Sequence, residues 1–111
     1  KAERLASMEI YYFHYDIATF LDSLEKSARA KVQRLVRLLS EKEYRLTFPW
    51  SRRLEKDLYE LRARGEQNVR VFYTFYRNKV VLLHVVSKKT RQLERQDLET
   101  ARTRLALLRD R

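Results

Sequence analysis

The sequence contains no cysteine, one glycine (Gly65) and one proline (Pro49). The lack of cysteine excludes disulfides, thiolate metal sites and cysteine nucleophiles. Two isolated histidines provide no metal-ligand cluster, and one glycine cannot build a glycine-rich phosphate loop. No linker, repeat or low-complexity stretch is visible. We therefore expect a single domain over residues 1–111, without a metal or a cofactor.

Long hydrophobic runs are also missing. The longest run, Val80–Val86, is interrupted by His84 and falls far short of the roughly 20 residues of a membrane span. The segment Lys1–Ser7 lacks the apolar stretch of a signal peptide. Met8 is a candidate start, in which case residues 1–7 are a tag or an extension; the sequence leaves this open. We expect a cytoplasmic protein that has no membrane partner.

Basic residues outnumber acidic ones, and the formal net charge is +10. A balance of this size favours a polyanionic partner, with nucleic acid as the first candidate and an anionic membrane surface as the second. The hydrophobic share of 44% is enough to build a core. Composition thus predicts a small globular domain that binds nucleic acid.

The hydrophobic pattern predicts an α+β fold. Helical spacing follows Asp16, a candidate N-cap, and recurs from Val32 to Leu39, which fits two helices or one bent helix. A third amphipathic helix is expected over Leu98–Leu108. Strands are expected at Met8–Phe13, Leu58–Ala63, Val69–Tyr76 and Val80–Ser87. The order β-α-α-β-β-β-α predicts an antiparallel meander, and Phe48–Trp50 is expected to pin the connection after the second helix to the core.

Basic residues concentrate between Arg62 and Arg91, where Glu66 is the only acid. Strand alternation places Arg70, Phe72 and Tyr76 on one face, which we expect to be open, and Val71 and Tyr73 on the core face. Cations neutralise phosphates and rings stack on unpaired bases, so the pattern favours single-stranded RNA. The alternative is structural: the rings fill the core, and the cations are solvated side chains at its edge. The RNA-binding candidates are Arg62, Arg64, Tyr76, Arg77 and Arg91.

The segment from Leu58 to Thr90 resembles a known family. Its landmarks are Leu58-Tyr59-Glu60-Leu61-Arg62, Gly65, Val69-Arg70-Val71-Phe72-Tyr73, Val81-Leu82-Leu83-His84 and Lys88-Lys89-Thr90. This ordered combination is similar to the RelE/HigB toxins, and most of all to the phage-derived HigB-like branch. The resemblance extends from Met8 to about Leu108.

The resemblance implies a twisted antiparallel sheet packed against two N-terminal helices, with an active cleft on the basic face. It also implies a toxin that cuts mRNA in the ribosomal decoding site, and a cognate antitoxin, often a helix-turn-helix protein. Arg70 matches the family's phosphate-holding arginine, and Lys88 and Lys89 match its basic pair. Leu58 and Glu60 stand where some members carry lysines, which leaves the proton-transfer group open.

RNA cleavage by the 2′-hydroxyl needs charge stabilisation at the phosphate and a proton for the leaving oxygen. Arg70 suits the stabilisation of charge because its planar guanidinium group can bind two phosphate oxygens and stays charged. Lys88 or Lys89 can add a second cation or serve as the acid. His84 is either a wall of the active site or a core histidine, and alternation places it on the face of Lys88. His14 is interpreted as structural or capping.

Two other functions remain open from the sequence. A ParE-like toxin would share the fold but inhibit DNA gyrase without cutting RNA. A basic RNA-binding module would bind RNA without catalysis. The convergence of Arg70 with Lys88 and Lys89 favours the nuclease over the gyrase inhibitor, because a gyrase inhibitor has no need for a phosphate site.

Overall fold

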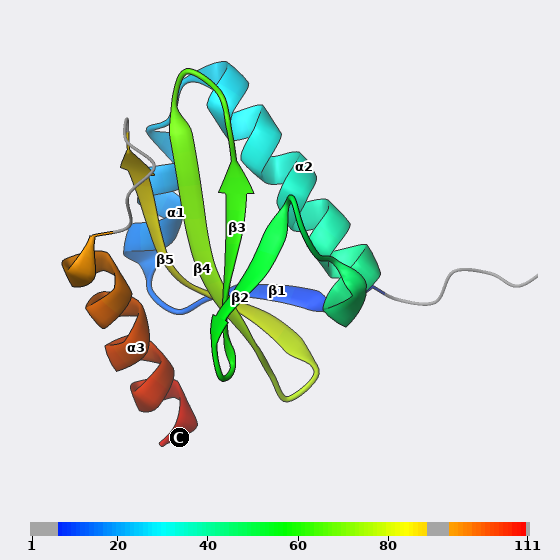
Figure 1. Cartoon of the computed structure of the whole chain (residues 1–111), viewed down its shortest axis with the longest axis vertical. Coiled ribbons are helices and arrows are strands. Elements are labelled where there is room, and N and C mark those ends of the chain that lie inside the picture. The colour runs from blue at the N-terminus through cyan, green and yellow to red at the C-terminus, as the bar shows by residue number, and fades with distance from the viewer. Residues whose placement is uncertain (1–6, 89–93, 111) are drawn as a thin grey trace, which may run out of the picture.

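The computed structural model describes residues 7–88 and 94–110 (Figure 1). The expected α+β class is confirmed, and the two N-terminal helices are separate. In chain order the elements are β1 (Glu9–Tyr12), α1 (Tyr15–Asp22), α2 (Lys26–Lys42), the short 3-10 helix η1 (Glu43–Arg45), β2 (Ser51–Glu55), β3 (Leu58–Ala63), β4 (Asn68–Tyr76), β5 (Lys79–Lys88) and α3 (Arg95–Arg109).

The five strands form one mixed sheet in the order β1-β5-β4-β3-β2. Strands β2 to β5 are the expected antiparallel meander, but β1 pairs with β5 in parallel. The expectation of a purely antiparallel sheet is therefore wrong. A parallel pair needs a long crossover connection, and here everything between β1 and β5 supplies it. A strand pattern identifies a strand but not the direction of its neighbour.

Strand β2 was not expected from the sequence. It lies at the edge of the sheet and carries exposed arginines, so it lacks the apolar alternation that marks a half-buried strand. The segment before it does not pin the connection to the core as expected, because Phe48 is largely exposed and Trp50 is about half exposed. Ser51 makes the anchoring contact instead, through a hydrogen bond between its hydroxyl and that of Tyr73. Burial raises the pKa of Tyr73 to about 12.

Helices cover both faces of the sheet, as Figure 1 shows: α1 and α2 lie on one side and α3 on the other. The first core joins the α1–α2 side to Val71 and Tyr73, which confirms their predicted core face, and to Val69 of the same strand. The second core packs α3 against the opposite face. Its buried members are Leu58, Phe72, Val81, Leu83, Val86, Ala101, Leu105 and Leu108.

Local signals account for the ends of two elements. Helix α1 is capped by His14, whose Nδ1 accepts a hydrogen bond from the Asp16 backbone N–H at 3.0 Å. Asp16 was the expected cap but lies in the first turn, where a negative charge favours the positive helix end. The β4–β5 hairpin turns at Arg77 and Asn78, both with positive φ, a conformation that asparagine adopts more readily than most residues. Within residues 7–88 and 94–110, no helix has the length and apolar character needed to span a membrane.

Candidate nucleic-acid interface

Three neighbouring strands bring a group of arginines to the face of the sheet that α3 partly covers. Across β2 and β3, Arg52 pairs with Glu60, and across β3 and β4, Arg62 pairs with Arg70. Side chains of paired residues lie on the same face of a sheet. Glu60 is opposite Phe72, a member of the α3 core, so all four charged residues belong to that face. We call Arg52, Arg62 and Arg70 the arginine cluster.

Glu60 is the common partner of the arginine cluster, and its carboxylate is completely buried. Its Oε1 lies 3.2 Å from Nε of Arg52 and 3.8 Å from Nε of Arg62. Its Oε2 accepts a hydrogen bond from Nη1 of Arg70 at 3.4 Å. A buried carboxylate is tolerable only when it is paired with cations and hydrogen-bond donors. Glu60 therefore fixes the positions of three guanidinium groups.

The cluster keeps an excess of positive charge. The three arginines carry three positive charges, and the carboxylate that they share carries one negative charge. The arginines range from half-exposed Arg52, through mostly buried Arg62, to buried Arg70. Burial lowers the pKa of Arg62 from its ordinary value, and Glu60 counters that shift. Partly desolvated cations of this kind attract an anion more strongly than cations in bulk water do.

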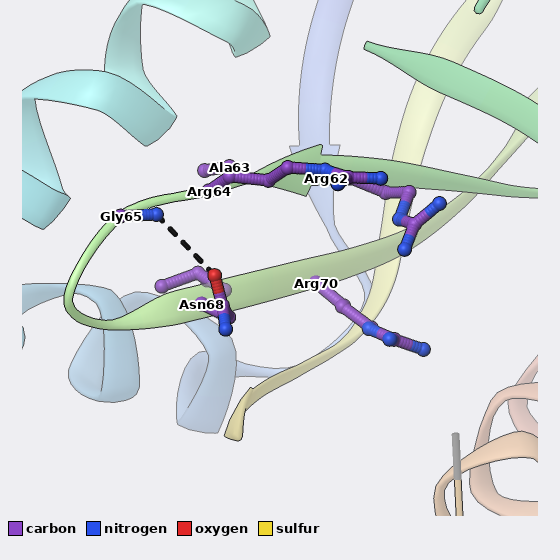
Figure 2. Close-up of a pocket in the computed structure, with 7 residues that line it drawn as sticks. Arg62, Ala63, Arg64, Gly65, Asn68 and Arg70 are labelled. Carbon is purple, nitrogen blue, oxygen red and sulfur yellow. Dashed lines mark hydrogen bonds between the residues drawn. The ribbon is translucent and has the colours of Figure 1, made fainter. Parts of the chain in front are cut away.

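A pocket of about 290 Å³ opens at the adjoining ends of β3 and β4 (Figure 2). Arg62, Arg64 and Arg70 contribute to its lining, together with the Gly65–Asn68 turn. The turn is closed by a hydrogen bond of 3.3 Å from the Gly65 N–H to Oδ1 of Asn68. Figure 2 shows the side chains of Arg62 and Arg70 leaving adjacent strands and extending the same way, away from the turn. The arrangement suits the binding of a phosphate group.

Arg70 does not lie on an open surface as the strand phase predicted. It is only 4% exposed, and Phe72, expected beside it as a stacking ring, is fully buried. Helix α3 covers that face, so both faces of β4 are buried for most of its length. Arg70 is thus a buried cation held by Glu60, and its removal affects folding as well as any ligand.

His84 lies on the α3 face because β5 carries an extra residue. Phe72 pairs with His84 but Tyr73 pairs with Leu82, so Leu83 has no partner of its own on β4. This bulge turns Leu83 and His84 toward α3 together. Nε2 of His84 donates to Oδ1 of Asp97, 3.1 Å away in the first turn of α3. The histidine therefore links β5 to α3 beside the arginine cluster.

The remaining predicted site residues fall into three groups. Arg64 lines the pocket, but Tyr76 and Arg77 lie at the opposite end of β4 from Arg70, about 20 Å away along the strand. The Arg77 guanidinium sits 5.0 Å above the half-buried Tyr76 ring. The basic stretch is thus divided between two ends of the sheet. Lys89 and Arg91 lie outside the described residues, as does the side chain of Lys88.

Sequence reasoning missed Arg52 and the role of Glu60. Arg52 lies on the unrecognised edge strand β2, and Glu60 was noted only as a departure from a lysine. One signal was available: a lone carboxylate inside an otherwise apolar strand must find a cation when it is buried. In the part of the chain that the structure describes, no group of three candidate ligands could hold a metal ion.

Comparison with protein families gives a match over residues 19–106 to the family described as "Phage derived protein Gp49-like (DUF891)". That family is toxin-like and is related to the RelE/HigB-type toxins. A search of curated proteins finds no match. The family match begins within α1, ends near the close of α3 and includes the whole arginine cluster. Because it covers well over half of the sequence, the chain belongs to the phage-derived Gp49-like family.

Proposed function

We propose that this protein is the toxin of a type II toxin–antitoxin system and acts as a ribosome-dependent, metal-independent endoribonuclease. The family is associated with toxin–antitoxin systems, which supports the toxin role. The observation that carries the nuclease proposal is the arginine cluster around buried Glu60, next to a pocket at the ends of β3 and β4. A preorganised group of cations is what phosphoryl transfer needs most.

The reaction is an attack of a ribose 2′-oxygen on the adjacent phosphorus. The new 2′-O–P bond forms as the P–O5′ bond breaks, giving a 2′,3′-cyclic phosphate and a free 5′-hydroxyl. The 2′-hydroxyl loses a proton and the leaving 5′-oxygen gains one. The guanidinium groups of Arg62 and Arg70 bind the non-bridging oxygens and stabilise the charge that develops on them.

The proton carriers are proposed from the sequence. Lys88 and Lys89 supply cations, one of which serves as the acid. His84 is the alternative, and it lies on the same sheet face as the cluster. Its Nε2 is engaged by Asp97, so proton exchange with RNA would use Nδ1 or require that bond to open.

The proposed partners follow from the same function. The mRNA is presented by the ribosome in its decoding site, and a cognate antitoxin, of the helix-turn-helix type in the HigB-like branch, inhibits the free toxin. Since this chain carries a net charge of +10, the antitoxin is expected to present acidic groups to it.

A non-catalytic RNA-binding module is the second candidate. The engagement of His84 Nε2 by Asp97 favours it, because a histidine committed to a structural bond is less available for proton transfer. A ParE-like gyrase inhibitor would share the fold class, but its function would not use the pocket beside Arg70.

Addition of the purified protein to a translating extract separates these functions. Mapping of mRNA ends should reveal new ends that appear only on translated messages, each upstream fragment ending in a cyclic phosphate. Gyrase-linked DNA breaks without mRNA ends would instead identify a ParE-like inhibitor. RNA binding without any new mRNA ends would identify a non-catalytic RNA-binding module.

A further inference from the structure

Trp50, the only tryptophan of the chain, presents an open ring beside the arginine cluster. Its side chain is 47% exposed, although its backbone is held firmly. The Trp50 N–H donates to Thr47 O at 3.2 Å, and Trp50 O accepts from the Arg62 N–H at 2.9 Å. A half-exposed indole on a fixed backbone leaves apolar surface in contact with water, which is unfavourable, and contributes little to the core. It is therefore a candidate contact for a ligand.

The surroundings of Trp50 are basic. A pocket of about 350 Å³ separates the start of β2 and the end of β3 from α2, and Trp50 lies on its wall. None of the described residues that line this pocket is acidic, and four are cations: Lys31, Arg34, Arg62 and Arg64. The Lys31 ammonium donates to the Arg64 carbonyl, which ties α2 to the β3–β4 turn and keeps a positive charge there.

This basic pocket adjoins the pocket beside Arg70. The two share Arg62, Ala63 and Arg64, which form the end of β3 and the residue after it. A ligand that places one phosphate near Arg70 can therefore continue past Arg64 toward Trp50 and α2. A nucleic-acid strand, whose phosphates repeat at every nucleotide, satisfies cations along the whole path.

We propose that Trp50, Lys31, Arg34 and Arg64 form a second nucleotide subsite, in which the indole stacks on one unpaired base and the cations hold the flanking phosphates of single-stranded RNA. The inference rests on the proposed RNA substrate but does not depend on cleavage. Stacking on an aromatic ring with phosphate neutralisation alongside is the usual mode of single-strand binding. Since every base has a π face, the subsite tolerates any sequence and secures a nucleotide next to the scissile one.

The occupant is RNA rather than a protein because every charged residue described in the lining of the pocket is a cation. Leu35 and Pro49 are the main apolar neighbours of the ring in this pocket, whereas cations make up half of the lining. Protein-binding hot spots are aromatic anchors in desolvated, largely apolar surroundings. An acidic protein such as an antitoxin is the competing occupant, and the experiment distinguishes it.

The single tryptophan makes the test direct, since its fluorescence reports on one site. The probe is a short single-stranded oligoribonucleotide of mixed sequence with 2′-O-methyl sugars, which cannot be cleaved because the attacking 2′-hydroxyl is blocked. Titration should quench the emission in a saturable way, and the same sequence as a duplex should quench it far less. The variants lack the tryptophan, so their affinities are measured from the fluorescence anisotropy of an end-labelled probe. Trp50→Leu should weaken binding roughly 5- to 150-fold, as expected for the loss of one stacked base, whereas Trp50→Phe should retain most of the affinity.

Phe48→Leu is the matched control, because Phe48 is a more exposed ring only two residues away and lines neither pocket. It should leave RNA affinity unchanged. Saturable RNA binding without quenching, or equal affinity of Trp50→Leu and the unchanged protein, would overturn the subsite. A Trp50→Leu protein that loses antitoxin binding but keeps its RNA affinity would also overturn the subsite. RNA binding with full quenching but no mRNA cleavage would reject the nuclease proposal and leave the subsite standing.

Discussion

Nη1 of Arg70 lies 3.4 Å from Oε2 of Glu60, a carboxylate that solvent does not reach. This contact links the candidate phosphate site to the stability of the sheet. Arg52 and Arg62 share the same carboxylate, so the three cations and Glu60 act as one unit. Substitutions in the unit change folding and ligand binding together, and the two effects have to be measured separately.

Arg70→Ala should lower the free energy of unfolding by about 1–3 kcal/mol, because it removes one donor from a buried carboxylate. If Arg70 lay on the surface, as strand alternation predicts, its substitution would lower the free energy of unfolding hardly at all. Chemical denaturation followed by circular dichroism measures the difference. An unfolding free energy equal to that of the unchanged protein would show that Glu60 does not depend on Arg70.

Glu60→Ala should cost more, about 3–5 kcal/mol, since it leaves three clustered arginines without their common partner. The double variant with Arg70→Ala should lose less than the sum of the single losses, with a coupling of about 0.5–3 kcal/mol. A double-mutant cycle by denaturation measures this coupling. Strict additivity would mean that the two residues do not interact.

His84→Ala and Asp97→Ala should each destabilise the protein by about 0.5–1.5 kcal/mol and speed amide exchange in the first turn of α3. The reason is that each removes one end of the bond between β5 and α3. Hydrogen exchange by mass spectrometry locates the change. A His84→Ala protein that cleaves mRNA at the original rate would exclude His84 as the proton carrier, whereas its structural role is judged from exchange alone.

Acid should loosen α3 before the rest of the fold. A hydrogen bond from Arg104 lowers the pKa of Asp16 from 3.8, and one from Arg102 lowers the pKa of Glu55 from 4.5. Both pairs attach α3, and Arg104 also donates to Leu83 O at 2.9 Å. Because the folded-state values are lowered, the stabilisation is complete above the ordinary values. It is lost as the pH falls through the folded-state values.

Amide exchange of α3 at a series of acidic pH values, corrected for intrinsic exchange rates, tests this order of events. Asp16→Asn and Glu55→Gln should make the exchange of α3 less dependent on pH, and the effects should be modest because both carboxylates are exposed to solvent. Uniform loosening of α2 and α3 would contradict the assignment.

RNA affinity should fall steeply with salt. If three or four phosphates are neutralised at the cluster end of the sheet, a fourfold rise in salt weakens single-strand binding about 20- to 50-fold. Arg64→Ala should reduce the slope, while Arg77→Ala, at the other end of β4, should not. Equal effects of both variants on the slope would place RNA along the whole basic stretch.

The sequence was sufficient to predict the α+β class, both N-terminal helices, α3 and three of the meander strands, because their apolar residues recur at helical or strand spacing. It failed on the exposure of Arg70. Strand β4 is apolar on both faces, with Val71 and Phe72 equally buried, and alternation cannot identify an open face there. A nearly continuous apolar run is itself a sign of burial on both sides.

Other features depended on tertiary contacts that leave little trace in the chain. Parallel pairing of β1 with β5, the bulge at Leu83 and the edge strand β2 follow from how the layers pack. Glu60 and Arg52 could be recognised as partners only once β2 and β3 were known to pair. Trp50, expected to pin the connection, is instead an exposed ring beside the basic pocket.

The central claim is that the arginine cluster stabilises the phosphate during mRNA cleavage on the ribosome. The most direct test compares mRNA ends in a translating extract for the unchanged protein, Arg70→Lys and Arg77→Lys, each first shown to be folded. Arg70→Lys keeps the charge beside Glu60 but loses the planar fork. We predict that cleavage falls at least about tenfold in Arg70→Lys and is unchanged in Arg77→Lys. Equal cleavage by all three proteins, or no new ends with the unchanged protein, would contradict the account.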